Sequence, residues 1–260
     1  MKIAEIAAAI ESFAPLAWQE SYDNSGLIVG RPDDEVHRAL LAVDVTEEVL
    51  DEAEREGCDM VITHHPIVFH ALKRFNSADL TQRCVERAIR SGIALYACHT
   101  NLDAAPDGMS VRLAGMLGVV RPEIMQPAGD SGAGFGAVGD LPEEVAFADF
   151  MERIRRVTGA RVLRHSAPAR PTVRRVAVCT GAGAFLMAEA RRAGADIYLT
   201  SDLKYNDFTA PDGAFTAVDA GHFESEYCAI EILFDILSKK LRTFAVRRSE
   251  CSCNPVHYFV

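Results

Sequence analysis

Short apolar runs alternate along the chain with stretches of helical period. The first residues place apolar side chains at helical spacing, which predicts an amphipathic helix at the N-terminus. Apolar runs at 39–44, 60–63 and 93–98 predict strands, and the segments 47–57 and 80–91 between them predict helices. This strand–helix–strand rhythm is typical of parallel α/β units.

The second half of the chain begins with a glycine-rich stretch, 126–140, which has no helical period and predicts a boundary or an excursion into a second lobe. A helix at 143–157 and a strand at 174–179 are expected next, followed by another helix and strand. We therefore expect an α/β protein with two lobes, each a mixed sheet flanked by helices. The predicted lobes are residues 1–125 with 214–260, and residues 126–213.

One pattern occurs twice. Shifting the chain by 137 positions aligns residues 38–65 with 175–202 without a gap, and the seven identical pairs include Asp59 with Asp196. This similarity indicates that the two lobes are related, although βαβ units also share pattern for physical reasons. The two copies differ at the end, where one has His64-His65 and the other has Ser201-Asp202.

The bulk composition is that of an ordinary globular protein, with 49% hydrophobic and 25% charged residues. A formal net charge of −10 argues against binding to a nucleic-acid backbone. No apolar run is long enough to span a bilayer, and the N-terminal helix is not a signal peptide, so we expect a cytoplasmic protein. The seven cysteines are scattered and odd in number, which favours free thiols.

Polar side chains follow three of the predicted strands, where open α/β sheets present their ligands. His64-His65 follows the strand 60–63, a segment from His99 to Asp103 follows the strand 93–98, and His222 with Glu226 follows a third apolar run. If a helix starts near Gly221, His222 and Glu226 share one face. The candidate metal ligands are His64, His65, Asp103, His222 and Glu226.

Imidazole nitrogen and carboxylate oxygen suit Zn, Mn, Fe, Co or Ni, whereas Mg and Ca prefer oxygen alone. Three histidines and two carboxylates from separate segments fit two bridged metal ions better than one closed tetrahedron. We therefore expect a dinuclear divalent-metal site in the cleft between the lobes. His99 is the candidate catalytic residue, as a proton-transferring or orienting group beside the metals.

Two glycine clusters need a separate interpretation. Gly134, Gly136 and Gly139 match G-x-G-x-x-G but do not link a strand to a helix, so we reject dinucleotide binding. The segment 180–183 does link a strand to a helix. It could bind an anion such as phosphate through backbone N–H groups, or it could be a tight turn.

Six motifs together resemble the NIF-three-like family, also called GTP cyclohydrolase I type 2 homologues, in its short bacterial form. They are YDNSGLIVG, ITHHPIVF, CHTNLDAAPDG, GFGAVGDL, ADIYLTSDLKY and DAGHFESE, and they run in order over nearly the whole chain. The resemblance implies a dinuclear centre on the same five ligands, two α/β lobes and a ring-shaped homohexamer. It also implies opening of the GTP imidazole ring, an activity reported for some members.

Three positions depart from the family pattern: Ala137 replaces an arginine, Asn206 a histidine and Ser201 a glycine. These changes leave the five ligands intact but alter groups that would handle a substrate. Our leading hypothesis is a metal-dependent hydrolase, a zinc enzyme for example, that acts on a nucleotide or a related heterocycle. The alternatives are a phosphoesterase and a non-catalytic metal-binding ring that acts as a scaffold or binds a protein partner.

Overall fold

The computed structural model describes residues 1–259, which form two compact units. Unit 1 consists of residues 1–102 and 229–253, and unit 2 of residues 103–228 and 254–259. The predicted lobe boundaries at 125/126 and 213/214 both fall inside unit 2. The first of them cuts strand β5, which is part of the sheet of that unit.

Unit 1 is a mixed five-stranded sheet in the order β1-β4-β3-β2-β11, in which β1 alone runs antiparallel to its neighbour. Its strands are β1 (Gly26–Val29), β2 (Arg38–Ala42), β3 (Met60–Thr63), β4 (Ala94–Ala97) and β11 (Ala245–Arg248). Its helices are α1 (Ile3–Glu11), η1 (Leu16–Trp18), α2 (Glu47–Arg55) and α3 (Leu80–Ser91). The helices α4 (Thr100–Asp103) and α9 (Cys228–Lys240) carry the chain between the units.

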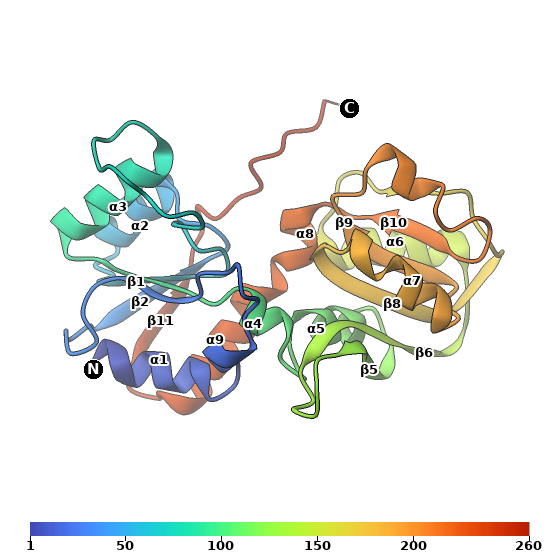
Figure 1. Cartoon of the computed structure of the whole chain (residues 1–260), viewed down its shortest axis with the longest axis horizontal. Coiled ribbons are helices and arrows are strands. Elements are labelled where there is room, and N and C mark those ends of the chain that lie inside the picture. The colour runs from blue at the N-terminus through green and yellow to red at the C-terminus, as the bar shows by residue number, and fades with distance from the viewer. Residues whose placement is uncertain (260) are drawn as a thin grey trace. The chain divides into compact units, whose positions relative to one another are not determined.

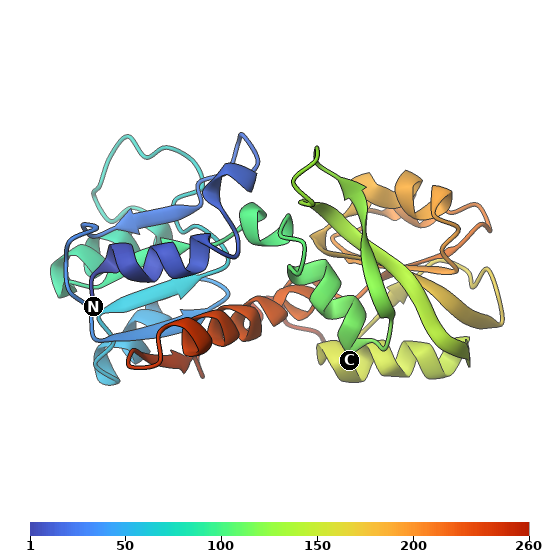
Figure 2. The ribbon, with the colours of Figure 1, turned by 90° about the horizontal axis from the view of Figure 1, so that it is seen from below.

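Helices cover both faces of this sheet, which explains why its central strands are apolar at nearly every position. Leu40, Val61 and Leu95 face α2 and α3 in one hydrophobic cluster. On the other face, the hydroxyl of Tyr96 donates to Glu11 Oε1 of α1 over 3.0 Å. Figure 1 shows α2 and α3 on one side of the sheet and α1 and α9 on the other, and Figure 2 shows α1 beside α9.

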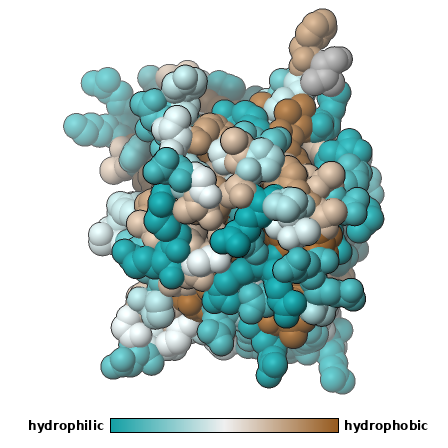
Figure 3. Space-filling model, turned by 90° about the vertical axis from the view of Figure 1, so that its right-hand side faces the viewer, coloured by the Kyte–Doolittle hydropathy of each residue, from teal (hydrophilic) through white to brown (hydrophobic). Residues whose placement is uncertain are grey.

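Unit 2 is a mixed six-stranded sheet in the order β5-β6-β8-β9-β10-β7. Its strands are β5 (Val120–Pro127), β6 (Gly134–Ala146), β7 (Arg164–His165), β8 (Thr172–Ala182), β9 (Ile197–Ser201) and β10 (Thr216–Asp219). Its helices are α5 (Met109–Met116), α6 (Phe147–Thr158), η2 (Ala184–Leu186), α7 (Met187–Arg192), η3 (Tyr205–Phe208) and α8 (His222–Glu226). The end face of this unit in Figure 3 mixes hydrophilic and apolar side chains.

The structure differs from the sequence pattern at two places in unit 2. The glycine-rich stretch is mostly the β5–β6 hairpin, and Gly134 lies where a Cβ atom would collide with the Gln126 carbonyl of β5. The helix expected from residue 143 begins at Phe147, because β6 continues far enough for Val145 to pair with Val173. In both places the sheet pairing outweighs the local pattern.

The repeated pattern has the same backbone geometry in both units. In unit 1 Ala39 pairs in parallel with Met60, and in unit 2 Val176, 137 residues later, pairs with Ile197. Asp59 accepts from the backbone N–H of Arg38 in one copy, and Asp196 accepts from that of Arg175 in the other. The predicted α/β fold of two related lobes with mixed sheets is therefore confirmed.

Candidate metal centre

Three histidines of unit 1 lie together at the carboxyl ends of two parallel strands. His64 and His65 follow β3, and His99 follows β4, its parallel neighbour. Their candidate ligand atoms all lie within 4.8 Å of one another. The ring centroid of His99 is 5.1 Å from that of His64 and 5.4 Å from that of His65. Side chains from two separate strand ends therefore form one group that could hold a metal ion.

Hydrogen bonds fix the orientation of the two adjacent rings. Nδ1 of His64 lies 2.9 Å from the carbonyl oxygen of Cys98, and Nδ1 of His65 lies 2.8 Å from Asp44 Oδ1. A carbonyl oxygen can only accept, so Nδ1 of His64 carries the proton and Nε2 presents the lone pair. Oxygen acceptors behind the ring in this way are usual for histidines that bind metals.

His99 is held in the same manner by a buried carboxylate. Its Nδ1 lies 2.7 Å from Oδ1 of Asp23, whose side chain is fully buried. The backbone N–H and the hydroxyl of Thr100 also donate to Asp23, as does the hydroxyl of Ser25. Burial alone would raise the pKa of Asp23, but the hydrogen bonds from His99 and Thr100 outweigh it and hold that pKa far below its ordinary value.

Unit 2 brings a histidine and a glutamate together on the short helix α8. Gly221, at φ +92°, precedes this helix, as expected for a start near Gly221. Nε2 of His222 lies 2.9 Å from Oε2 of Glu226, one turn further on. Nδ1 of His222 lies 2.8 Å from Oδ2 of Asp202. Burial lowers the pKa of His222, but Glu226 and Asp202 outweigh it and raise that pKa to about 9.

Asp202 holds His222 from a backbone conformation that is rare outside glycine. It follows β9 with φ at +56°, in the left-handed region. In the sequence repeat it stands opposite His65 of the first copy. One copy of the βαβ unit therefore ends in two candidate ligands, whereas the other ends in a carboxylate that orients a candidate ligand.

The end of β8 and the residue after it support Glu226 rather than an anion. The backbone N–H of Gly181 donates to the hydroxyl of Ser225 over 3.0 Å, and that of Gly183 donates to the hydroxyl of Thr200 over 2.9 Å. Side chains of the protein therefore already occupy the N–H groups that could have held a phosphate. Gly181, at φ +63°, leaves space for the carboxylate, because a Cβ atom there would overlap Oε1 of Glu226. Residues 180–182 are the end of β8 rather than a separate turn, and this use of their N–H groups argues against the anion interpretation.

Asp103 lies in the same unit as Glu226. Burial raises the pKa of the Cys179 thiol to about 12, and the negative charges of Asp103 and Glu226 contribute to that rise. Burial and the same two carboxylates also raise the pKa of Cys228. Both carboxylates therefore act on the same two buried thiols of unit 2.

Of the six residues predicted for the site, His64, His65 and His99 form one group in unit 1, and His222 and Glu226 one in unit 2. The sequence interpretation missed the carboxylates that orient the rings: Asp23, Asp44 and Asp202. Asp44 and Asp202 each come shortly after an apolar strand, which is the signal that could have found them. Asp23 carries no such signal.

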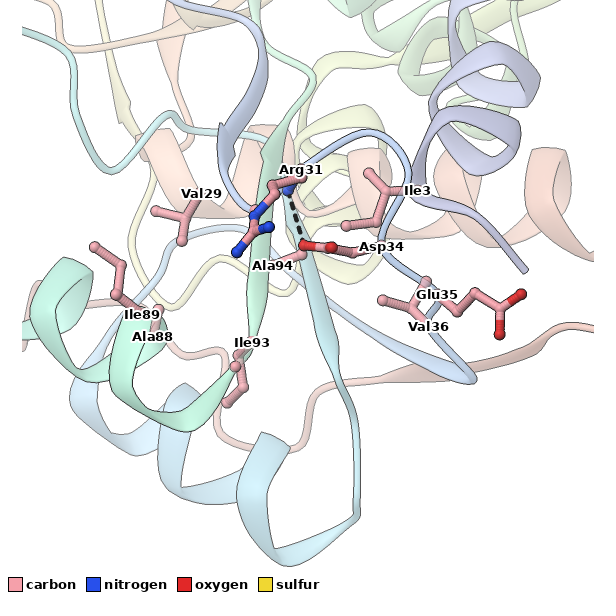
Figure 4. A pocket seen from close by; sticks show the side chains of 12 residues that line it. Ile3, Val29, Arg31, Asp34, Glu35, Val36, Ala88, Ile89, Ile93 and Ala94 are labelled. Atoms are coloured by element: carbon pink, nitrogen blue, oxygen red, sulfur yellow. Dashed lines mark hydrogen bonds between the residues drawn. The ribbon is translucent and has the colours of Figure 1, made fainter.

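A cavity of about 600 Å³ lies at the opposite end of the unit 1 sheet from the histidines. Ala94, the first residue of β4, and the preceding Ile93 help to line it, whereas His99 follows the end of the same strand. Figure 4 shows its apolar walls, with the backbone N–H of Arg31 donating to Asp34 at the rim over 3.1 Å. Its lining, within residues 1–259, contains no histidine or cysteine, so it is not the predicted metal site.

Comparison with known proteins gives one consistent result. The family model described as Duf34/NIF3 (NGG1p interacting factor 3) matches residues 1–255. A GTP cyclohydrolase 1 type 2 homolog from Streptomyces coelicolor is 34% identical over 233 residues, which cover 87% of this chain and 82% of that protein. A protein of the same name from Clostridium perfringens is 32% identical over 229 residues, 87% of each chain.

Solved structures share the fold. A hypothetical protein from Staphylococcus aureus matches with a TM-score of 0.91 at 24% identity, covering 100% of this chain and 99% of that one. Reduced HcgD from Methanocaldococcus jannaschii matches with a TM-score of 0.80 at 27% identity, covering 96% and 98%. Over residues 1–259, no helix combines the length and the apolar character needed to cross a membrane.

Proposed function

Because the chain belongs to the DUF34/NIF3 family, we propose that it is a metal-dependent hydrolase acting on a nucleotide or a related nitrogen heterocycle. In this proposal two divalent metal ions are held by His64, His65, Asp103, His222 and Glu226. The name GTP cyclohydrolase 1 type 2 homolog, carried by relatives about a third identical, supports a purine nucleotide as the substrate class.

The observation that carries the proposal is the common arrangement of the histidines. His64, His65 and His222 each direct Nδ1 at an oxygen acceptor within 2.9 Å, so Nε2 is the nitrogen that would bind a metal, and in His222 it already faces the Glu226 carboxylate, the neighbouring candidate ligand. His37, an exposed histidine away from the site, also directs Nδ1 at a carboxylate, so the grouping of such rings at strand ends supports the proposal beside their orientation. Three rings oriented in the same way at strand ends fit a metal-binding role.

The donor set also selects the class of metal. Imidazole nitrogens with carboxylate oxygens suit Zn, Mn, Fe, Co or Ni. Gly181 leaves room for the Glu226 carboxylate, a cradle that any side chain would fill. A bound divalent ion of this class lowers the pKa of a water molecule toward neutrality and so supplies a nucleophile.

In this proposal His99 transfers the protons of the reaction. Asp23 fixes its ring through Nδ1, so Nε2 is the atom that exchanges protons with the substrate. In hydrolysis of a ring C–N bond, His99 takes a proton from the attacking water and returns it to the nitrogen that leaves. The buried Asp23 carboxylate stabilises the imidazolium that exists between these two transfers.

The test is metal content per chain on untagged protein, followed by GTP turnover on the same sample. We expect about two divalent ions per chain. Glu226→Gln and His65→Ala should lose metal, whereas His37→Ala should not, because His37 is an exposed partner of Asp59. Full metal content in both ligand variants would refute the assignment. If two metal ions bind but GTP is not turned over, the metal centre stands as proposed. Phosphoesters and a scaffold role would then be tested next.

A further inference from the structure

Two aromatic side chains remain open to solvent beside the histidine group of unit 1. Tyr22 is 64% exposed and Phe69 is 39% exposed. Their ring centroids lie 6.3 Å apart at 61°, so they form a contiguous pair although they come from separate segments of the sequence. Single exposed aromatic residues are common, but an adjoining pair beside a cluster of polar groups is what a ligand site usually presents.

The aromatic pair lies directly beside the histidine group of the proposed site. The ring centroid of Phe69 lies 6.0 Å from that of His99, with the planes at 82°. His99 in turn lies 5.1 Å from His64. A flat ring that stacks on one of the two aromatic side chains would meet the other edge-on, because their planes are at 61°, and it would lie beside His99.

Hydrogen bonds hold the two aromatic segments in place. The side-chain amide of Asn24 donates to the carbonyl oxygen of Val68 over 2.7 Å, which ties the segment beside Tyr22 to the segment beside Phe69. Asp23, next to Tyr22, is anchored by Thr100 and Ser25. The backbone on both sides is thus fixed before any ligand arrives, which reduces the entropy lost on binding.

The size of the pair indicates the kind of ligand. A stable protein–protein interface buries roughly 800 Å² on each partner, far more than two aromatic rings provide. One nucleobase stacks on one or two aromatic side chains, because every base has a π-face that can stack. Phenol and phenyl rings carry no charge, so they select the flat base rather than the phosphates.

We propose that Tyr22 and Phe69 form the surface on which the heteroaromatic base of the substrate stacks, beside His99. This inference rests on the proposed function for the identity of the substrate. It assigns base recognition to unit 1 and names two residues that recognise the base through their rings alone.

The test is isothermal titration calorimetry of the metal-loaded full chain with GTP and, separately, with tripolyphosphate. Tyr22→Ala and Phe69→Ala should each weaken GTP binding by about tenfold, since one base–aromatic stack contributes on that order. Affinity for tripolyphosphate and metal content should stay at the wild-type values. Tyr22→Phe keeps the ring and should retain GTP affinity. Tyr22→Ala is the cleaner variant, because Phe69 also contacts His99.

Three outcomes would overturn the inference: wild-type chain that binds tripolyphosphate as tightly as GTP, alanine variants that bind GTP as well as wild type, or the same loss in Tyr22→Phe as in Tyr22→Ala. None of these outcomes contradicts the proposed metal centre, provided that the metal content is unchanged. Conversely, a chain without metal that still loses GTP affinity on Tyr22→Ala would support base stacking while refuting the proposed hydrolase.

Discussion

Gly181 lies against the carboxylate of Glu226, so close that a methyl group on Gly181 would overlap Oε1. The contact is local to unit 2, and the backbone N–H of Gly181 is bonded to Ser225, the residue before Glu226. The end of β8 therefore determines where a predicted ligand lies. No property of residues 222–226 alone would reveal this.

Gly181→Ala should lower metal content and stability together. The control is Gly194→Ala, because Gly194 has φ +69° and nothing within 4 Å of its added Cβ, so it shares only the left-handed strain of about 1 kcal/mol. Gly181→Ala should cost about 1–3 kcal/mol more, measured by urea unfolding, because of the overlap. Equal metal content in the two variants would contradict a role for Gly181 in placing Glu226.

Asp202→Gly should separate stability from metal binding. Glycine accepts the left-handed backbone that Asp202 adopts at φ +56°, so the free energy of unfolding should change by no more than about 1 kcal/mol. Loss of the carboxylate behind His222 should weaken metal binding by about 10- to 100-fold. Asp212→Gly, at φ +47° and outside the site, is the control and should leave metal affinity unchanged. Competition with a chelator measures the affinity.

Asp23→Asn should slow catalysis without removing metal. Asparagine can still hydrogen-bond to Nδ1 of His99, but it cannot stabilise the imidazolium by charge. We expect GTP turnover to fall by about 10²-fold or more with metal stoichiometry unchanged. If metal is lost together with activity, His99 is a metal ligand rather than a proton-transfer group.

Glu52→Gln should destabilise the chain in a pH-dependent way. The fully buried carboxylate of Glu52 accepts from the hydroxyl of Ser249 over 2.5 Å and from the backbone N–H groups of Glu250 and Cys251, which holds the segment after β11 on α2. Burial raises the pKa of Glu52, but these hydrogen bonds outweigh it and lower that pKa below its ordinary value of 4.5. The variant should lose about 1–3 kcal/mol at pH 7.

The lowered pKa determines the pH window of this effect. Ionised Glu52 favours the folded state, so its contribution is complete above pH 4.5 and declines as the pH falls below that value. The stability difference between wild type and Glu52→Gln should therefore shrink in acid, as followed by urea unfolding at several pH values. Glu48→Gln, on the exposed side of the same helix, should show no such trend. A difference that grows in acid would refute the assignment.

The sequence predicted those features that depend on local pattern. The strand at 60–63 and the helix at 80–91 have the predicted bounds, because their apolar period is uninterrupted. The helix expected from residue 143 failed, since only the pairing of Val145 with Val173 shows that the strand continues. The orienting carboxylates share that difficulty: Asp23 and His99 are 76 positions apart, and only the folded backbone brings them together.

The matching register of β2–β3 and β8–β9 has a consequence for how this protein could change. Each frame ends in a dipeptide whose first residue is fully buried: His64-His65 in one and Ser201-Asp202 in the other. Part of the chemical difference between the related halves therefore lies in these two dipeptides. Swapping the dipeptides would show whether the frame or its last two residues determine what each half contributes.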